Sequence, residues 1–149
     1  MKSVMLDTNT ASYIVKPGHP HVLYWLERAA RTQKITMSAV TRGELIYGLA
    51  LRSFPKVLTA AVNDLLHQVV VLPWDTKVSD TYGKARAWFR QQGVTLAALD
   101  MMIAAHAIAE DATLITSDTS FEPLTSPTQR DCPFRLLVRN WMEPPVQNK

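Results

Sequence analysis

The chain has 149 residues, of which 47% are apolar and 19% are charged. This length fits one domain with a sizeable core, and the apolar share excludes a disordered chain. No apolar run approaches the ~20 residues that a membrane-spanning helix needs. The only cysteine, Cys132, excludes an internal disulfide, so we expect a reducing, cytoplasmic setting. The net charge of +3 permits a polyanionic partner without requiring one.

Short apolar segments alternate with longer segments of helical periodicity along the chain. The expected strands, in chain order, are residues 4–6, 35–37, 69–72, 114–115 and 136–138. Helical stripes are expected at residues 23–30, 45–52, 78–89 and 101–109. This alternation predicts an α/β fold in which helices cover both faces of a mostly parallel sheet of four to five strands. The segment 69–72 is continuously apolar, which predicts a strand covered on both faces.

The expected domain covers residues 1–142 and is followed by a flexible tail at 143–149. A proline-containing loop at 122–133 precedes the last expected strand. His106 lies in the most apolar helical segment, which is typical of a core histidine rather than of a metal ligand.

Four acidic residues stand where an open parallel sheet forms its binding sites. Asp7 directly follows the first expected strand, and Asp118 comes shortly after the fourth. Parallel strands end at the same edge of a sheet, so both carboxylates belong to one rim. Glu44 and Asp100 lie near the starts of two expected helices, from which they can reach the same cleft.

Each acid also has a purely structural interpretation. Asp7 is typical of a helix cap and Asp118 of a turn, while Thr41 to Glu44 matches a capping box and Asp100 suits the positive end of a helix. Carboxylates that share a cleft repel one another, however, and a divalent cation removes that conflict. An all-oxygen set favours Mg²⁺ or Mn²⁺ over zinc, and such a site can hydrolyse a phosphodiester.

In these motifs the sequence resembles the PIN-domain ribonucleases and, among them, the VapC toxins of toxin–antitoxin pairs. The segments that carry the resemblance follow the order of the family over nearly the whole chain. They are Met5-Leu6-Asp7-Thr8-Asn9, Arg42-Gly43-Glu44-Leu45-Ile46-Tyr47-Gly48, Leu99-Asp100-Met101-Met102-Ile103-Ala104-Ala105-His106-Ala107, Thr113-Leu114-Ile115-Thr116-Ser117-Asp118 and Asn140-Trp141.

The resemblance implies a PIN-like α/β/α sandwich, dependence on Mg²⁺ or Mn²⁺, a homodimer and a neutralising VapB-like antitoxin. It implies a catalytic and metal-binding quartet formed by Asp7, Glu44, Asp100 and Asp118. It further implies that Thr8, Asn9 and Thr116 orient these carboxylates. Asp118 stands where relatives often have asparagine. The stretch around 122–133 is longer than is usual in the family.

The implied activity is that of an endoribonuclease toxin that cuts transfer or ribosomal RNA and inhibits translation. Arg86 and Arg90 lie four residues apart on one helix face, and we expect them to contact RNA phosphates. An alternative is a catalytically silent module that binds RNA or protein on the same fold. A phosphatase of the haloacid-dehalogenase type is disfavoured, because it needs a second acid where this chain has Asn9. A phosphoacceptor receiver domain is also disfavoured, because Pro73-Trp74 follows the third expected strand.

Overall fold

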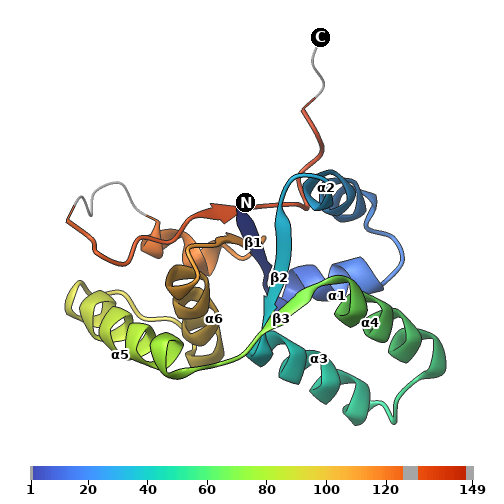
Figure 1. Ribbon diagram of the computed structural model, residues 1–149, viewed down its shortest axis with the longest axis horizontal. Coiled ribbons are helices and arrows are strands. Elements are labelled where there is room, and N and C mark those ends of the chain that lie inside the picture. The colour runs from blue at the N-terminus through green and yellow to red at the C-terminus, as the bar shows by residue number, and fades with distance from the viewer. Residues whose placement is uncertain (1, 126–130, 147–149) are drawn as a thin grey trace.

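The computed structural model describes residues 2–125 and 131–146 (Figure 1). In chain order its elements are β1 (Ser3–Leu6), α1 (Thr8–Val15), α2 (Pro20–Ala30), β2 (Lys34–Ser38), α3 (Ala39–Leu51), α4 (Lys56–Gln68), β3 (Val70–Leu72), α5 (Thr76–Gln91), α6 (Ala98–Ala109), β4 (Thr113–Ile115), the 3₁₀ helix η1 (Thr119–Leu124) and β5 (Val138–Arg139). The expected α/β fold is therefore confirmed. No helix in these described ranges is long and apolar enough to cross a membrane.

Several helices begin at a side chain that caps them. Asp7 accepts a hydrogen bond from the Thr10 N–H at 2.7 Å, and α1 follows directly. Ser38 does the same for α3, and Asp75 for α5, through the N–H groups two or three residues further on. These short oxygen-bearing side chains satisfy backbone donors that the first helical turn leaves without partners, so the sequence itself fixes where these helices start.

The five strands form one sheet in the order β3-β2-β1-β4-β5, and every neighbouring pair is parallel. The chain builds outward from β1 through β2 to β3, and then returns to the other side of β1 to add β4 and β5. The direction of growth thus reverses between β1 and β4. Ligands of open parallel sheets bind outside the carboxyl ends of the strands at such a reversal.

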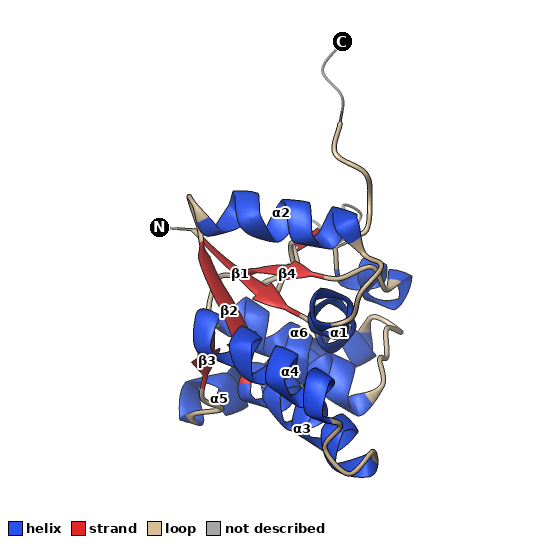
Figure 2. Ribbon diagram, turned by 90° about the vertical axis from the view of Figure 1, so that its right-hand side faces the viewer, coloured by secondary structure: helices blue, strands red, loops and turns tan. Residues whose placement is uncertain are grey.

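Helices cover both faces of the sheet (Figures 1 and 2). Neighbouring strand residues point to opposite faces, so Leu6 and Ile115 pack with α1–α4, while Met5 and Leu114 pack with α5 and α6. All four side chains are fully buried. The central strands are held between two apolar layers, and their carboxyl ends are fixed in position by both.

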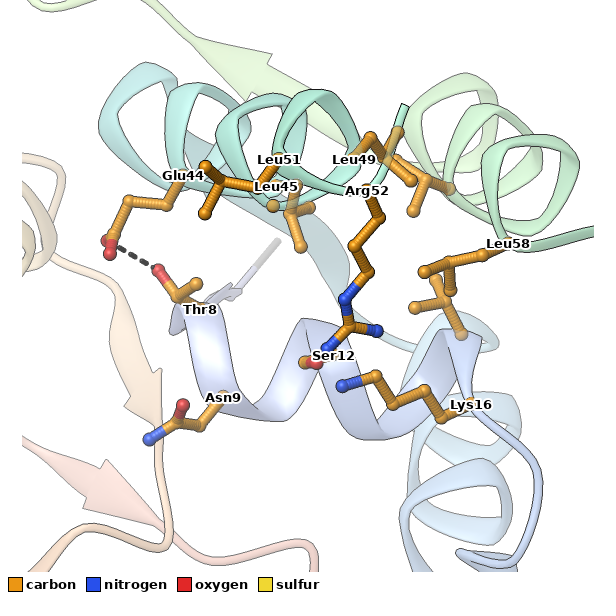
Figure 3. Close-up of a pocket in the computed structure, with 13 residues that line it drawn as sticks. Thr8, Asn9, Ser12, Lys16, Glu44, Leu45, Leu49, Leu51, Arg52 and Leu58 are labelled. Carbon is orange, nitrogen blue, oxygen red and sulfur yellow. Dashed lines mark hydrogen bonds between the residues drawn. The ribbon is translucent and has the colours of Figure 1, made fainter. Parts of the chain in front are cut away.

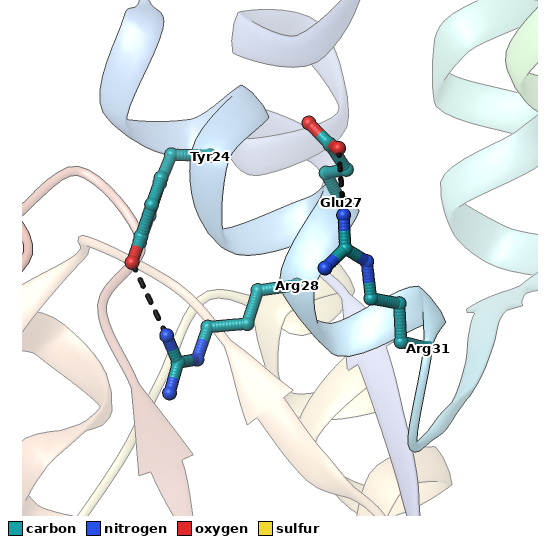
Figure 4. Close-up of polar contacts among 4 residues, drawn as sticks. All are labelled: Tyr24, Glu27, Arg28 and Arg31. Carbon is teal, nitrogen blue, oxygen red and sulfur yellow. Dashed lines mark hydrogen bonds and ion pairs between the residues drawn. The ribbon is translucent and has the colours of Figure 1, made fainter.

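The outer face of α2 carries an ordinary solvated charge pattern (Figure 4). Arg31 pairs with Glu27 at 3.2 Å, one turn away, and Arg28 donates to the Tyr24 hydroxyl at 3.3 Å. The side chains of the ion pair are about three-quarters exposed. Exposed pairs of this kind contribute little to stability.

Two details of the sheet differ from the sequence-based predictions. The expected double coverage of the third strand is wrong, because β3 is an edge strand and Val70 is 42% exposed. The last strand is shifted toward the C-terminus: it is Val138–Arg139, while Leu136 is buried before it. An apolar run shows that a segment is strand-like, but strand order decides how many neighbours it has.

The expected loop and tail are described only in part, because residues 126–130 and 147–149 lie outside the described ranges. Before that gap the chain forms η1. After β5, the indole N–H of Trp25 donates to the Glu143 carbonyl at 2.9 Å, which connects the start of the expected tail to α2.

Candidate active site

The carboxyl ends of β1 and β4 lie side by side and bring Asp7 near Asp118. The Asp7 N–H donates to the carbonyl of Ile115 at 3.1 Å, which extends the pairing of the two strands by one residue. The Asp118 N–H in turn donates to the Thr116 hydroxyl at 3.0 Å. Both acids therefore follow their strands in a fixed backbone geometry, as expected from their places in the sequence.

Asp7 is the most buried acid of the rim, with 4% of its surface exposed. Burial raises the pKa of its carboxyl group, and the negative charge of Asp118 adds to that effect. Hydrogen bonds from Thr116 and Thr10 oppose the rise in pKa. Asp7 therefore caps α1 and also holds a carboxylate at the sheet edge, so its structural and functional interpretations are both compatible with the geometry.

Glu44 reaches the rim from α3 and is held there by α1. Its carboxylate accepts a hydrogen bond of 2.7 Å from the Thr8 hydroxyl, which also lies 3.4 Å from the hydroxyl of Thr41. The capping-box interpretation of Thr41 and Glu44 is wrong, because α3 begins at Ala39 with Ser38 as its cap. The side chain of Glu44 is therefore free of a capping role and is oriented by Thr8.

The negative charges of the other three acids act on the carboxyl group of Asp100. Asp100 lies in the first turn of α6. Burial raises the pKa of its carboxyl group, and the negative charges of Asp118, Glu44 and Asp7 raise it further, in that order. Like charges raise the pKa of a carboxyl group when they lie near it. The four acids therefore surround one region, although they come from four separate segments of the chain.

The four carboxylates do not form a closed cage. Within residues 2–125 and 131–146, no three acidic, histidine or cysteine side chains are close enough together to hold a metal ion as they stand. Two of the carboxylates already take part in hydrogen bonds: Glu44 accepts from the Thr8 hydroxyl, and Asp118 accepts from the N–H of Ser120 at 2.8 Å. Repulsion between like charges also favours separated positions. The site is thus an electrostatic cluster of four carboxylates, and holding a metal ion would require their side chains to rotate toward one another.

The remaining predicted site residues lie at different distances from this cluster. Thr8 and Thr116 are within it, through the hydrogen bonds described above. Asn9 is exposed, and Figure 3 shows its side chain pointing away from Glu44. Arg86 and Arg90 are on α5 and line a separate hollow.

A groove that sequence analysis missed opens beside Glu44, between α1, α3 and α4. Its volume is about 220 Å³, and Figure 3 shows Glu44 and Thr8 at one end and Lys16 and Arg52 at the other. Leucine side chains form much of the wall between these ends. The residues belong to three helices, and no spacing within one segment could have indicated that they share a cavity.

His106 occupies the core behind the rim. Its Nδ1 lies 2.7 Å from the hydroxyl of Ser38, the residue that caps α3. The ring of Trp74 meets the imidazole edge-on, with centroids 5.6 Å apart. Burial lowers the pKa of His106, opposed by the charges of Glu110 and Asp75, so the ring is neutral at pH 7. His106 thus joins α6, which carries Asp100, to the start of α3, which carries Glu44.

The fold and the rim together define an α/β/α protein with a cluster of acids at the switch point of a parallel sheet. The family model described as "PIN domain" matches residues 4–125. The chain therefore belongs to the PIN domain family, in the group that contains the VapC ribonucleases.

Two relatives and one solved structure illustrate this placement. The chain is 32% identical over 115 residues to "Ribonuclease VapC2" of Rickettsia felis, covering 76% of this chain and 85% of that protein. It is 30% identical over 118 residues to the "tRNA(fMet)-specific endonuclease VapC" of Salmonella typhimurium, covering 79% and 88%. The solved structure of VapBC2 from Rickettsia felis bound to a promoter DNA fragment superposes with a TM-score of 0.79 at 28% identity, covering 93% of this chain and 98% of the matched chain.

Proposed function

We propose that this protein is a metal-dependent endoribonuclease, the toxin of a toxin–antitoxin module that acts in the cytoplasm and inhibits translation. The observation that carries the proposal is the concentration of negative charge at Asp100, whose carboxyl group senses three other acids from distant parts of the chain. In the described residues the only ion pair is Arg31–Glu27 on α2, so none of the four acids forms an ion pair with a basic side chain. An arrangement that costs stability in the free protein is typical of a site that binds a cation.

The donor set fits Mg²⁺ or Mn²⁺. All four candidate ligands offer carboxylate oxygens, the hard donors that these ions prefer, whereas a zinc site would draw on histidine or cysteine. We assign Asp7 and Asp100 as the main ligands, with Glu44 and Asp118 completing the site. An ion of this type, held by these carboxylates, would supply positive charge that activates the phosphodiester and a water molecule for hydrolysis.

The chain's own residues would prepare this chemistry by positioning. The Thr10 N–H and the Thr116 hydroxyl hold the Asp7 carboxylate, and the Thr8 hydroxyl holds that of Glu44. Glu44 would orient the attacking water and accept its proton. Attack on phosphorus breaks the bond to the 3′ oxygen, which takes up a proton, so that the products carry a 5′-phosphate and a 3′-hydroxyl group.

We further propose that a VapB-like antitoxin covers the groove that ends at Glu44, and that the toxin itself is a homodimer. The groove combines a leucine-rich wall with Lys16 and Arg52, which suits an amphipathic segment that carries a carboxylate. Several solved relatives are toxin–antitoxin complexes, including VapBC from Salmonella typhimurium. Leu51 lines the groove and is 68% exposed, so Leu51→Lys should weaken inhibition by the antitoxin without unfolding the toxin.

The deciding experiment is incubation of the purified protein with transfer RNA, with Mn²⁺ and with a chelator in parallel. The name of the Salmonella typhimurium relative makes initiator tRNA the first substrate to test. We expect cleavage with 5′-phosphate ends in Mn²⁺, and none with chelator or with Asp100→Asn. Equal cleavage by the Asp100→Asn protein would refute the assignment. RNA binding without any cleavage or metal effect would instead support the silent binding module.

A further inference from the structure

A second hollow, of about 150 Å³, lies on the side of α6 that faces α5. It combines two arginines with apolar side chains and one hydroxyl. Its lining residues are Arg86, Arg90, Val94, Thr95, Leu96 and Met101.

A glycine turn creates one wall of this hollow. Helix α5 ends at Gln91, and Gly93 follows with φ +79°, a left-handed conformation that residues with a side chain rarely adopt. The Gly93 N–H donates to the carbonyl of Arg90, and the Val94 N–H donates to that of Phe89 at 2.9 Å. The chain therefore turns back against the last turn of α5, and residues 94–96 come to face the arginines.

Both arginines have donors free to bind an anion. They are four residues apart on α5 and so share one face of the helix. Arg86 is steadied by Tyr82: its guanidinium donates to the hydroxyl at 2.8 Å and lies 5.8 Å from the ring centroid. Within residues 2–125 and 131–146, neither arginine has a carboxylate partner, in contrast to Arg31. A guanidinium group without an acid partner is well suited to bind a phosphate through two parallel hydrogen bonds.

Helix α6 contributes residues both to the hollow and to the acidic rim. Met101 forms part of its wall, and the preceding residue is Asp100. An RNA backbone that approaches the four acids meets a repulsive field, which nearby cations can offset. The two arginines provide positive charge on α5, the helix that packs against α6.

We propose that this hollow is a nucleotide subsite for RNA, occupied by a residue of the strand that flanks the scissile linkage. Arg86 and Arg90 bind its phosphate, and the sugar and base pack against Val94, Leu96 and Met101. The proposal rests on the proposed function, since it assumes RNA as the substrate. The subsite lies outside the acid quartet. It would contribute binding energy and fix the position of the RNA strand relative to the four acids.

The test measures RNA binding separately from cleavage. A labelled single-stranded ribo-oligonucleotide is titrated with Asp7→Asn protein in chelator, at several salt concentrations, with and without the double substitution Arg86→Gln and Arg90→Gln. Each lost phosphate contact on single-stranded RNA lowers the slope of log affinity against log salt by about 0.7, so loss of the one phosphate held by both arginines should lower the slope by about 0.7. Affinity at low salt should drop at least roughly tenfold.

Lys84→Gln is the matched control. Lys84 is exposed on the same helix, loses one positive charge when replaced by glutamine, as each of the two arginines does, and does not line the hollow. It should leave the salt slope unchanged. Replacing both arginines with lysine should restore the slope but only part of the affinity, because lysine keeps the charge without the bidentate geometry. An equal loss of slope in the Lys84→Gln and double arginine variants would overturn the subsite, because it would indicate a general charge effect.

Cleavage assays separate this inference from the proposed function. If the parent cuts RNA, the double arginine variant should show a raised KM with kcat little changed, as expected for a contact made equally in ground and transition states. Equal KM and equal salt slopes in an active enzyme would reject the subsite alone. RNA bound with an arginine-dependent slope but never cleaved would reject the nuclease and retain the subsite. Loss of antitoxin binding with RNA binding intact would reassign the hollow to the protein partner.

Discussion

Two charged regions of this protein are organised in opposite ways. On the outer face of α2, Glu27 and Arg31 neutralise each other at 3.2 Å in full contact with solvent. At the carboxyl edge of the sheet, Asp7 is buried and the charges of three other acids act on Asp100. The first arrangement is what helical spacing produces on any solvated surface. The second arrangement opposes folding, because each additional negative charge raises the electrostatic energy of the other carboxylates in the folded state.

This difference indicates where function resides. A paired surface charge can be replaced at little cost, and it has no role that requires its position. A cluster of like charges persists only if something outside the free chain compensates for it. The two regions should therefore respond differently to substitution, to metal ions and to pH.

The largest contrast should be in catalysis. Asp7→Asn should lower the rate of RNA cleavage at least about 100-fold, because loss of a metal ligand should exceed the 10- to 100-fold effect of losing an outer partner. The fold should remain, since an asparagine oxygen can still accept from the Thr10 N–H and cap α1. Asp7→Ala removes the cap as well and should be about 1 kcal/mol less stable than the Asp7→Asn variant. Cleavage rates and thermal unfolding of the two variants measure this difference.

Metal binding should offset the loss of stability that repulsion within the acidic rim causes. At an Mn²⁺ concentration about 100 times the dissociation constant, the folded state gains about 2.7 kcal/mol, which corresponds to a rise in Tm of about 5–10 °C. The Asp7→Asn and Asp100→Asn double variant should lose most of this rise. Thermal scans with and without Mn²⁺ provide the measurement, and an equal rise in parent and double variant would place the ion elsewhere.

Without metal, the acidic rim should make the protein less stable as the pH rises. Asp100 has a higher pKa in the folded state than the value of 3.8 of a free side chain. Between pH 3.8 and its raised pKa, this carboxyl group is more protonated in the folded protein than in the unfolded chain. The free energy of unfolding therefore falls as the pH rises and the carboxyl group ionises. In chelator at pH 7, Asp100→Asn should therefore have a higher Tm than the parent. The gain should disappear as the pH approaches 4, and a gain independent of pH would point to a different cause.

The sequence predicted the acidic rim where it depends on local rules. Asp7 and Asp118 each follow an apolar strand, and parallel strands end at the same edge. Glu44 and Asp100 were placed less directly, from their positions near the starts of two expected helices, and the resemblance to a known family implied the same quartet. The capping-box prediction failed because the pattern from Thr41 to Glu44 is only meaningful where a helix begins, and Ser38 starts this helix one turn earlier.

Features that depend on how segments meet could not be predicted. The run at 69–72 was recognised as a strand, but its exposure follows from its place at the sheet edge. The groove beside Glu44 and the hollow beneath Arg86 need several helices to be packed before they exist. Gly93 is visible in the sequence, yet only its positive φ shows that the following residues turn back toward the arginines.

The smallest effect should come from the paired charges of α2. Glu27→Gln removes the ion pair with Arg31, whose partners are about three-quarters exposed. Solvent already stabilises both charges, so the free energy of unfolding should change by less than about 1 kcal/mol, and added salt should reduce that change further. RNA cleavage should equal that of the parent. Thermal unfolding at low and high salt, beside the Asp100→Asn variant, tests the contrast directly: a larger effect at Glu27 than at Asp100 would mean that pairing, rather than crowding of like charges, dominates the electrostatics of this fold.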